Sequence, residues 1–164
     1  MLPRTFTRAV PASLFISRRI TQKGIRLNSA ALLQLRNLHL HEYQSKQLMD
    51  KYNVDTQKFK VVTSVDQVLK ATQDLLDQNA QEFVIKAQVH AGGRGKGTLS
   101  SGLKGGVQLT TDQEKTKDFV SKMLGYRLVT HQTPPEGVPV QKVMIAEALD
   151  IARETYFAIL MDRS

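Results

Sequence analysis

The sequence predicts an α+β domain in which helices pack on a sheet in two layers, and two observations carry this prediction. Hydrophobic runs of the kind found in strands alternate along residues 38–164 with segments whose apolar side chains recur at helical spacing. These roughly 127 residues are also enough to bury a hydrophobic core. Helices and strands each have an apolar face to cover, so an alternating order of this kind predicts packed layers.

The first expected helix covers His41–Tyr52, where apolar residues recur at rough helical spacing. His41 and Glu42 at its start are interpreted as cap and surface groups. A strand follows at Phe59–Thr63, and a second helix begins at Ser64. One face of this second helix is expected to join the core through residues at i, i+3 and i+4 spacing: Val65, Val68, Leu69, Thr72, Leu75 and Leu76.

The second half of the chain is expected to contain one helix and several strands. The helix, Thr111–Leu124, is capped by Thr111 or Asp112 and ends at Gly125. The expected strands are Glu82–Val89, Val107–Leu109, Tyr126–Thr130, Lys142–Leu149 and Arg153–Asp162. No later element can pair with the last of them or cover it. We therefore interpret residues 38–164 as the first part of a domain that is truncated before it is complete.

Residues 1–37 differ from the rest of the chain in charge. Residues 1–36 hold seven basic residues and no acidic ones, so without them the net charge falls from +8 to +1. Arginine-rich, acid-free composition with interleaved Ser, Thr and apolar residues is typical of a mitochondrial transit peptide. A disordered basic tail is the alternative. No run approaches the ~20 apolar residues of a membrane span, and the absence of cysteine excludes disulfides and fits a reducing matrix.

A glycine-rich loop follows the expected strand at Glu82–Val89. Residues 92–97 contain four glycines, with Arg94 and Lys96 between them. Glycines let successive backbone N–H groups converge on one point, and the two cations add positive charge there. The loop is therefore expected to bind an anion, and a polyphosphate fits best. A flexible turn with solvated cations is the alternative.

Two common phosphate-binding motifs do not fit this loop. A P-loop requires Ser or Thr after Gly95-Lys96, where this chain has Gly97, and a glycine five residues before Gly95, where it has His90. A Rossmann fingerprint requires a glycine at Thr98. What remains is a strand lysine, Lys86, seven residues before Gly93.

This arrangement resembles the ATP-grasp superfamily, in which a strand lysine and a glycine-rich flap hold the nucleotide phosphates. Four segments are more specifically similar to the beta-subunit family of succinyl-CoA synthetase (succinate–CoA ligase). They are LHEYQSKQLM (40–49), KAQVHAGGRGKG (86–97), EALDIARETY (147–156) and LMDRS (160–164). The resemblance runs in unbroken order from about Leu38 to the last residue.

The resemblance implies that Lys86 contacts the nucleotide phosphates and that Gly93, Arg94 and Gly95 close over the β- and γ-phosphates. The residues support the first role independently, because burying a lysine in a hydrophobic strand is costly unless it meets an anion. The alternative is a lysine at the strand edge that extends to water.

The resemblance also implies a base site between the last two strands. It assigns base contacts to Glu147 and Leu149, and a second polar contact, to the ribose, to Glu154. Two surface acids at a turn are the alternative. The segments EALDIARETY and LKGGV are more similar to the GDP-forming than to the ADP-forming subtype. Gln57 occupies the position where the GDP-forming subtype has a glutamine near the base, and an amide can hydrogen-bond to guanine O6.

The family reaction is reversible: succinyl-CoA, phosphate and a nucleoside diphosphate give succinate, CoA and the triphosphate, with GTP/GDP favoured over ATP/ADP here. The resemblance implies a heterodimer with an alpha subunit that supplies a phosphorylated histidine and most of the CoA site. It implies that Mg²⁺ is bound by positions that this chain lacks. His41, His90 and His131 are therefore interpreted as loop or surface residues.

Two other functions remain open at this point. The chain could be a non-catalytic, truncated product of the same family. The Gly/Arg loop could instead bind RNA, although it is a single element without interleaved aromatic residues, in a domain of net charge +1.

Overall fold

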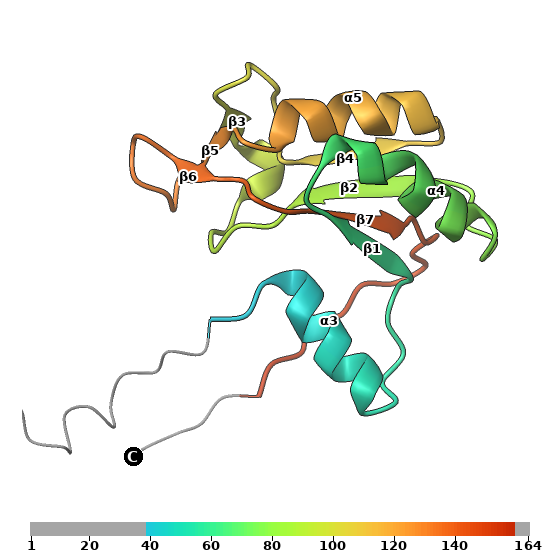
Figure 1. Ribbon diagram of the computed structural model, residues 1–164. Helices are drawn as coiled ribbons and strands as arrows, with labels where there is room; N and C mark the ends of the chain where they lie inside the picture. The colour runs from blue at the N-terminus through green and yellow to red at the C-terminus, as the bar shows by residue number, and fades with distance from the viewer. Residues whose placement is uncertain (1–38, 160–164) are drawn as a thin grey trace, which may run out of the picture. The chain divides into compact units, whose positions relative to one another are not determined.

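The computed structural model describes residues 39–159. The expected transit peptide and the end of the last expected strand lie outside these residues. A four-stranded antiparallel sheet forms the centre of the fold, with strand order β1-β7-β2-β4 (Figure 1). These strands are β1 (Phe59–Val62), β7 (Val143–Glu147), β2 (Phe83–Ala87) and β4 (Val107–Thr110). The prediction of a mixed α+β fold is confirmed.

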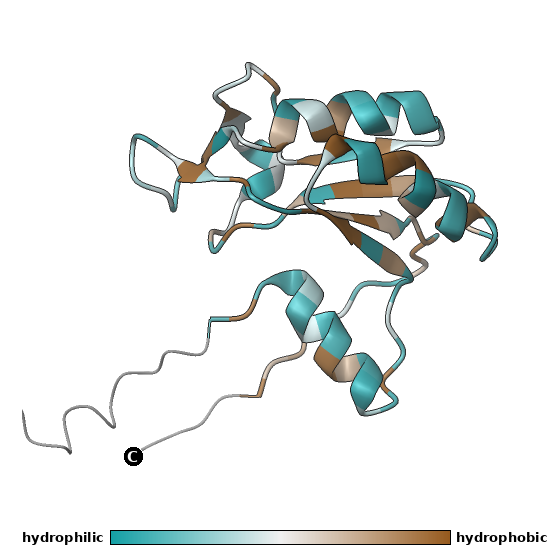
Figure 2. Ribbon diagram, viewed as in Figure 1, coloured by the Kyte–Doolittle hydropathy of each residue, from teal (hydrophilic) through white to brown (hydrophobic). Residues whose placement is uncertain are grey.

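Helices cover both faces of this sheet. Side chains alternate between the faces of a strand, so Phe83, Ile85 and Ala87 of β2 point into the main core. Helices α4 (Val68–Leu76) and α5 (Gln113–Met123) cover that core. Figure 2 shows apolar residues concentrated in the strands, with polar residues on the outer sides of these helices.

Helix α3 (Glu42–Lys51) lies on the opposite face, where Tyr43 packs against Met144 and Ala146. The fold therefore has three layers, and the expected two-layer arrangement did not include the layer formed by α3. The pleat also places Lys86, one residue from Ile85 and Ala87, on the α3 face.

A smaller sheet joins β3 (Thr98–Leu99), β5 (Arg127–Val129) and β6 (Val138–Pro139) in the order β3-β5-β6. Short 3₁₀ turns, η1 (Val65–Gln67) and η2 (Arg94–Lys96), complete the elements. The sequence did not predict β3, β6 or η2. Each is only two or three residues long, too short to show a hydrophobic period.

Most element ends follow local sequence signals. His41 is the N-cap of α3, as expected. Asp112 caps α5, where its side chain accepts hydrogen bonds from the N–H groups of Glu114 and Lys115 at 2.8 and 3.2 Å. Gly125 follows the helix with a φ of +80°, a conformation that suits glycine at a helix end.

Two expectations about packing are wrong. The segment Arg153–Ile159 forms no strand, and its Tyr156 is 92% exposed. A strand needs a hydrogen-bonding neighbour, and none of the strands within residues 39–159 pairs with this segment. In α4, Leu69 was expected in the core but is exposed, and Ala71 is buried instead. Within the described part of the chain, no helix is long and apolar enough to cross a membrane.

Candidate nucleotide-binding site

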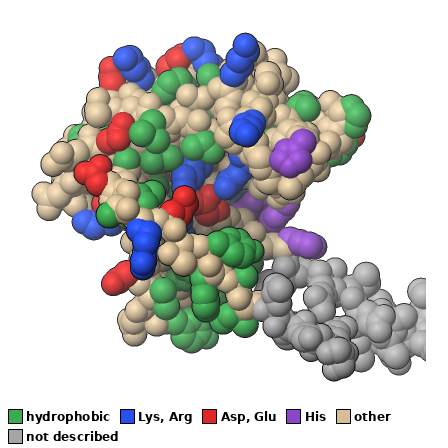
Figure 3. All heavy atoms as spheres, turned by 180° about the vertical axis from the view of Figure 1, so that it is seen from behind, with side chains coloured by type: hydrophobic (Ala, Val, Ile, Leu, Met, Phe, Trp, Pro, Cys, Tyr) green, Lys and Arg blue, Asp and Glu red, His purple; other side chains and the backbone are tan. Residues whose placement is uncertain are grey.

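Lys86 and Arg94 share one carboxylate on the α3 face of the sheet. Lys86 Nζ lies 3.1 Å from Oε1 of Glu42, and Arg94 Nη2 lies 2.7 Å from Oε2 of the same side chain. All three side chains are only 21–25% exposed. Figure 3 shows this side of the molecule, where basic and acidic side chains meet in a recess beside the histidines. The strand lysine and the loop arginine that the sequence singled out are therefore brought together.

The interpretation of Glu42 as a surface group is wrong. Glu42 is the first residue of α3, and its contacts with Lys86 and Arg94 span 44 and 52 residues of sequence. Burial raises the pKa of its carboxyl group, but the hydrogen bond from Arg94 and the charge of Lys86 outweigh burial, so the pKa lies below its usual value. Glu42 is therefore ionised at neutral pH.

Backbone contacts hold Arg94 in place. Its Nη1 donates to the carbonyl of Ala87 at the end of β2, at 2.8 Å. Its own carbonyl accepts from the N–H groups of Gly106 at 2.7 Å and Gly97 at 3.2 Å. The guanidinium is therefore held by β2 and by Glu42, and the backbone of Arg94 is held by the loop, before any ligand binds.

The two glycines that flank Arg94 differ in whether the structure would accommodate a side chain at their position. Gly93 has a φ of +71°, and a Cβ atom there would lie 2.4 Å from Cε1 of His131. Gly95 has open space around it. Among the described residues, the backbone N–H groups of Gly93, Arg94 and Gly95 donate to no protein acceptor. These N–H groups are therefore available to an anion, and they belong to a glycine loop that carries Arg94.

Gln57 and Glu147 also meet on this side of the fold. Gln57 Nε2 donates to the backbone carbonyl of Glu147 at 3.2 Å, and its Oε1 accepts from Lys46 Nζ at 2.8 Å. The Glu147 carboxylate accepts from the N–H of Lys58 at 2.8 Å. The structure therefore joins two of the residues expected near the base, although they are 90 positions apart.

Helix α3 connects the two groups of residues. Glu42 and Lys46 are four positions apart and so lie on the same side of the helix. The charges of both groups affect the pKa of Lys46, which lies below its usual value. Burial and the positive charge of Lys86 lower this pKa, and the negative charges of Glu42 and Glu147 raise it by less. The sequence analysis missed Glu42 and Lys46, although their spacing and opposite charge could have marked this side of α3.

The other expected base contacts lie in more open positions. Glu147 and Leu149 line a cavity of about 340 Å³ that extends to Asp150. A neighbouring cavity of about 290 Å³ is lined by Gln57, Lys58 and residues of α3. Glu154 is exposed within the irregular C-terminal segment, and the structure does not bring it to the other site residues. Its contact with the ribose stays a prediction.

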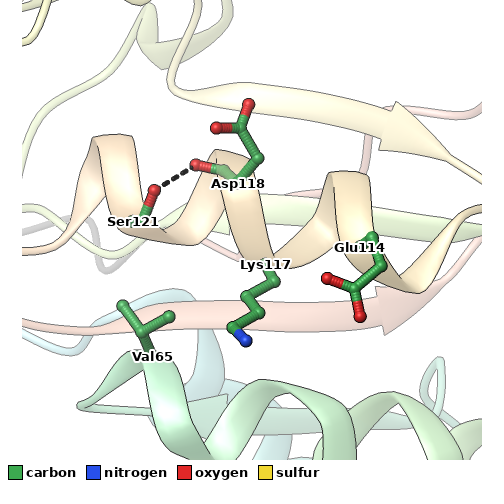
Figure 4. A pocket seen from close by; sticks show the side chains of 5 residues that line it. All are labelled: Val65, Glu114, Lys117, Asp118 and Ser121. Atoms are coloured by element: carbon green, nitrogen blue, oxygen red, sulfur yellow. Dashed lines mark hydrogen bonds between the residues drawn. The ribbon is translucent and has the colours of Figure 1, made fainter.

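A further pocket lies outside this site. It has a volume of about 280 Å³ and is lined by five residues of η1 and α5: Val65, Glu114, Lys117, Asp118 and Ser121 (Figure 4). It lies on the α4–α5 side of the sheet, whereas Lys86 points to the α3 side. We therefore exclude it from the candidate site.

Histidines border the glycine loop. The rings of His41 and His90 stack with centroids 3.8 Å apart. Burial lowers the pKa of His41, and the nearby charges of His90, Lys142 and Arg94 lower it further, so this ring is neutral at pH 7. Within residues 39–159 there is no cluster of three or more His, Cys, Asp or Glu that could hold a metal ion.

A sequence model of the ATP-grasp domain matches residues 39–164. The chain belongs to the ATP-grasp family. The resemblance based on Lys86 and the glycine loop is therefore confirmed at the level of the family, and so is the prediction of an ATP-grasp fold.

This ATP-grasp chain is similar to beta subunits of mitochondrial succinate–CoA ligases. It is 54% identical over 141 residues to the GDP-forming subunit from Mus musculus, covering 86% of this chain and 32% of the relative. It is 58% identical over 127 residues to that from Sus scrofa, covering 77% and 29%. The ADP-forming subunit from Arabidopsis thaliana is 47% identical over 130 residues, covering 79% and 30%. The chain thus spans about a third of the length of these relatives.

Proposed function

We propose that this chain is the nucleotide-binding part of a succinate–CoA ligase beta subunit that acts with an alpha subunit in the mitochondrial matrix. The observation that carries the proposal is the meeting of Lys86 and Arg94 at one carboxylate in an ATP-grasp chain, with Arg94 in a glycine loop. The relatives that bear this name are mitochondrial. Residues 1–37 act as the transit peptide in this proposal.

In the proposed mechanism the chain holds and orients a nucleoside diphosphate for phosphoryl transfer. The phosphates bind the N–H groups of Gly93–Gly95, and Lys86 and Arg94 neutralise their charge. These cations exchange their contacts with Glu42 for contacts with the phosphates. The phosphoryl group arrives from a histidine of the alpha subunit, after succinyl-CoA and phosphate have formed succinyl phosphate.

Mg²⁺ in such a reaction neutralises charge on the transferring phosphoryl group. Within residues 39–159 no group of three or more His, Cys, Asp or Glu could hold a metal ion. In this proposal the described residues contribute phosphate and base recognition, and none of them is assigned to Mg²⁺.

GTP and GDP are the favoured nucleotides in this proposal. Identity is 54–58% to the GDP-forming subunits from mouse and pig and 47% to the ADP-forming subunit from Arabidopsis. Gln57 lies against Glu147, so an amide is present where the base is expected. No observation favours RNA binding, since the loop is a single element without interleaved aromatic residues in a domain of net charge +1.

The reaction itself is the test of the proposal. The full-length protein, co-purified with its alpha subunit, is incubated with succinyl-CoA, phosphate, Mg²⁺ and GDP or ADP. We expect succinate and the corresponding triphosphate to form, faster with GDP. Absence of triphosphate from both diphosphates, in a complex that is folded and assembled, would overturn the proposal.

A further inference from the structure

The side-chain amide of Gln57 has only one orientation that suits its two neighbours. An ammonium group can only donate hydrogen bonds, so the amide atom 2.8 Å from Lys46 Nζ must be the oxygen. A backbone carbonyl can only accept, so the amide atom 3.2 Å from the Glu147 carbonyl must be the nitrogen. Turning the amide over would set its NH₂ group against the ammonium and its oxygen against the carbonyl.

This orientation decides what the amide can offer to a ligand. One N–H of Gln57 is used by the carbonyl of Glu147, so the second N–H remains available. The oxygen keeps a free lone pair, but this lone pair lies beside the positive charge of Lys46. A ligand amino group that approached this oxygen would carry its partial positive charge toward an ammonium. A ligand oxygen would be attracted by both the N–H and the ammonium.

Lys46 is itself held in position. It extends from α3, where it lies one turn after Glu42, and its Nζ lies 6.0 Å from the centre of the Phe59 ring on β1. Phe59 in turn packs against the small core formed by Tyr43, Met144 and Ala146. The ammonium therefore has contacts from both the strand and Gln57, and it is positioned before a ligand arrives.

We infer that Lys46 is a specificity-determining positioning residue, which fixes the Gln57 amide so that the site selects a purine with a 6-oxo group over one with a 6-amino group. This inference rests on the proposed function, which places the base beside Gln57. Lys46 acts through Gln57, and it does so whether or not the phosphates contact Lys86.

The test compares three diphosphates that differ only in the base. GDP and IDP both carry a 6-oxo group, whereas ADP carries a 6-amino group. Dissociation constants are measured by calorimetry for the full-length protein with its alpha subunit, as wild type, Lys46→Met, Lys46→Arg and Lys51→Met. Lys51 is the matched control, since it is an exposed lysine of the same helix, and its Nζ lies 6.0 Å from the centre of the Tyr52 ring.

For Lys46→Met we expect the ratio of GDP affinity to ADP affinity to fall about 3- to 10-fold, the effect of one hydrogen bond. The ratio of GDP to IDP should stay unchanged, because both bases present the same oxygen. Lys46→Arg keeps a donor-only cation and should retain most of the preference, and Lys51→Met should retain all of it. Retained ADP binding shows that the Lys46→Met protein is folded.

A purely structural role of Lys46 would weaken binding of all three nucleotides alike, and that result would overturn the inference. So would an unchanged GDP to ADP ratio. If Lys46→Met binds no nucleotide at all, Lys46→Gln replaces it in the test. The amide of the new glutamine can pair with either orientation of Gln57, so the ratio of GDP affinity to ADP affinity should fall in the same way. Failure of the wild-type protein to bind any of the three would instead refute the proposed function.

Discussion

Replacing Glu42 with glutamine removes the carboxylate that Lys86 and Arg94 share, while it keeps the size of the side chain. Breaking a buried ion pair costs about 3–5 kcal/mol, and an exposed pair contributes about 0–1 kcal/mol. The three side chains are 21–25% exposed, between these limits, and the amide keeps one acceptor oxygen. We therefore expect Glu42→Gln to lower the free energy of unfolding by about 2 kcal/mol at pH 7.

The pH dependence of this effect gives a second test of the same substitution. The pKa of Glu42 in the folded protein lies below its ordinary value of 4.5, so its stabilising contribution is fully present above that value and is lost as the pH falls through the folded pKa. The difference between wild type and variant should therefore be largest above pH 4.5 and shrink in acid.

Urea unfolding of the 164-residue chain, followed by circular dichroism from acid to neutral pH, measures both quantities. The exposed pair between Lys122 and Asp118, at 2.6 Å, supplies the control substitution Asp118→Asn, which should change stability by less than about 1 kcal/mol. Equal stability of wild type and Glu42→Gln at pH 7, or a difference that does not shrink in acid, would refute the reasoning about Glu42.

Two further predictions concern the glycine loop and the leader. Gly93→Ala should lower the free energy of unfolding by about 1–3 kcal/mol, because residue 93 has a positive φ and no room for a Cβ atom. Gly95→Ala, with open space around it, should stay within about 0.5 kcal/mol of wild type. Equal effects in urea unfolding would contradict this contrast. Residues 1–37 fused to a fluorescent reporter should direct it to mitochondria, and Arg18→Glu with Arg19→Glu should abolish import. A cytosolic signal from the unmodified fusion would show that the leader is not a transit peptide.

Local sequence signals predicted the regular elements well where a long apolar pattern or a cap was present. The period of α4, the cap at Asp112 and the glycine after α5 are all properties of neighbouring residues. The continuous hydrophobic run around Lys86, followed by the glycine loop, was enough to single out this lysine. The strand expected at Arg153–Asp162 failed because a strand also needs a partner, and an apolar run alone does not supply one.

The site was predicted only in part because its contacts are long-range. Lys86 and Arg94 stood out through the glycine loop beside them, but the residue that joins them, Glu42, lies more than 40 positions earlier. Gln57 entered through a family resemblance, and its orientation by Lys46 depends on how α3 packs on the sheet. No pattern in the sequence specifies that packing directly. The roles of the individual site residues stay predictions.

The central claim is that Lys86 binds nucleotide phosphate, and the affinity for GDP of the Lys86→Met variant tests it most directly. Methionine keeps much of the apolar stem and removes the charge. The control is Lys60→Met, because Lys60 is also a strand lysine in an ion pair, 3.0 Å from Asp74, but it is more exposed and pairs with α4. In the full-length protein with its alpha subunit, Lys86→Met should weaken GDP binding by about 10- to 100-fold, the loss of one charge-assisted contact of about 1.5–3 kcal/mol. Lys60→Met should leave GDP binding unchanged. A folded Lys86→Met protein with wild-type affinity for GDP would contradict the claim.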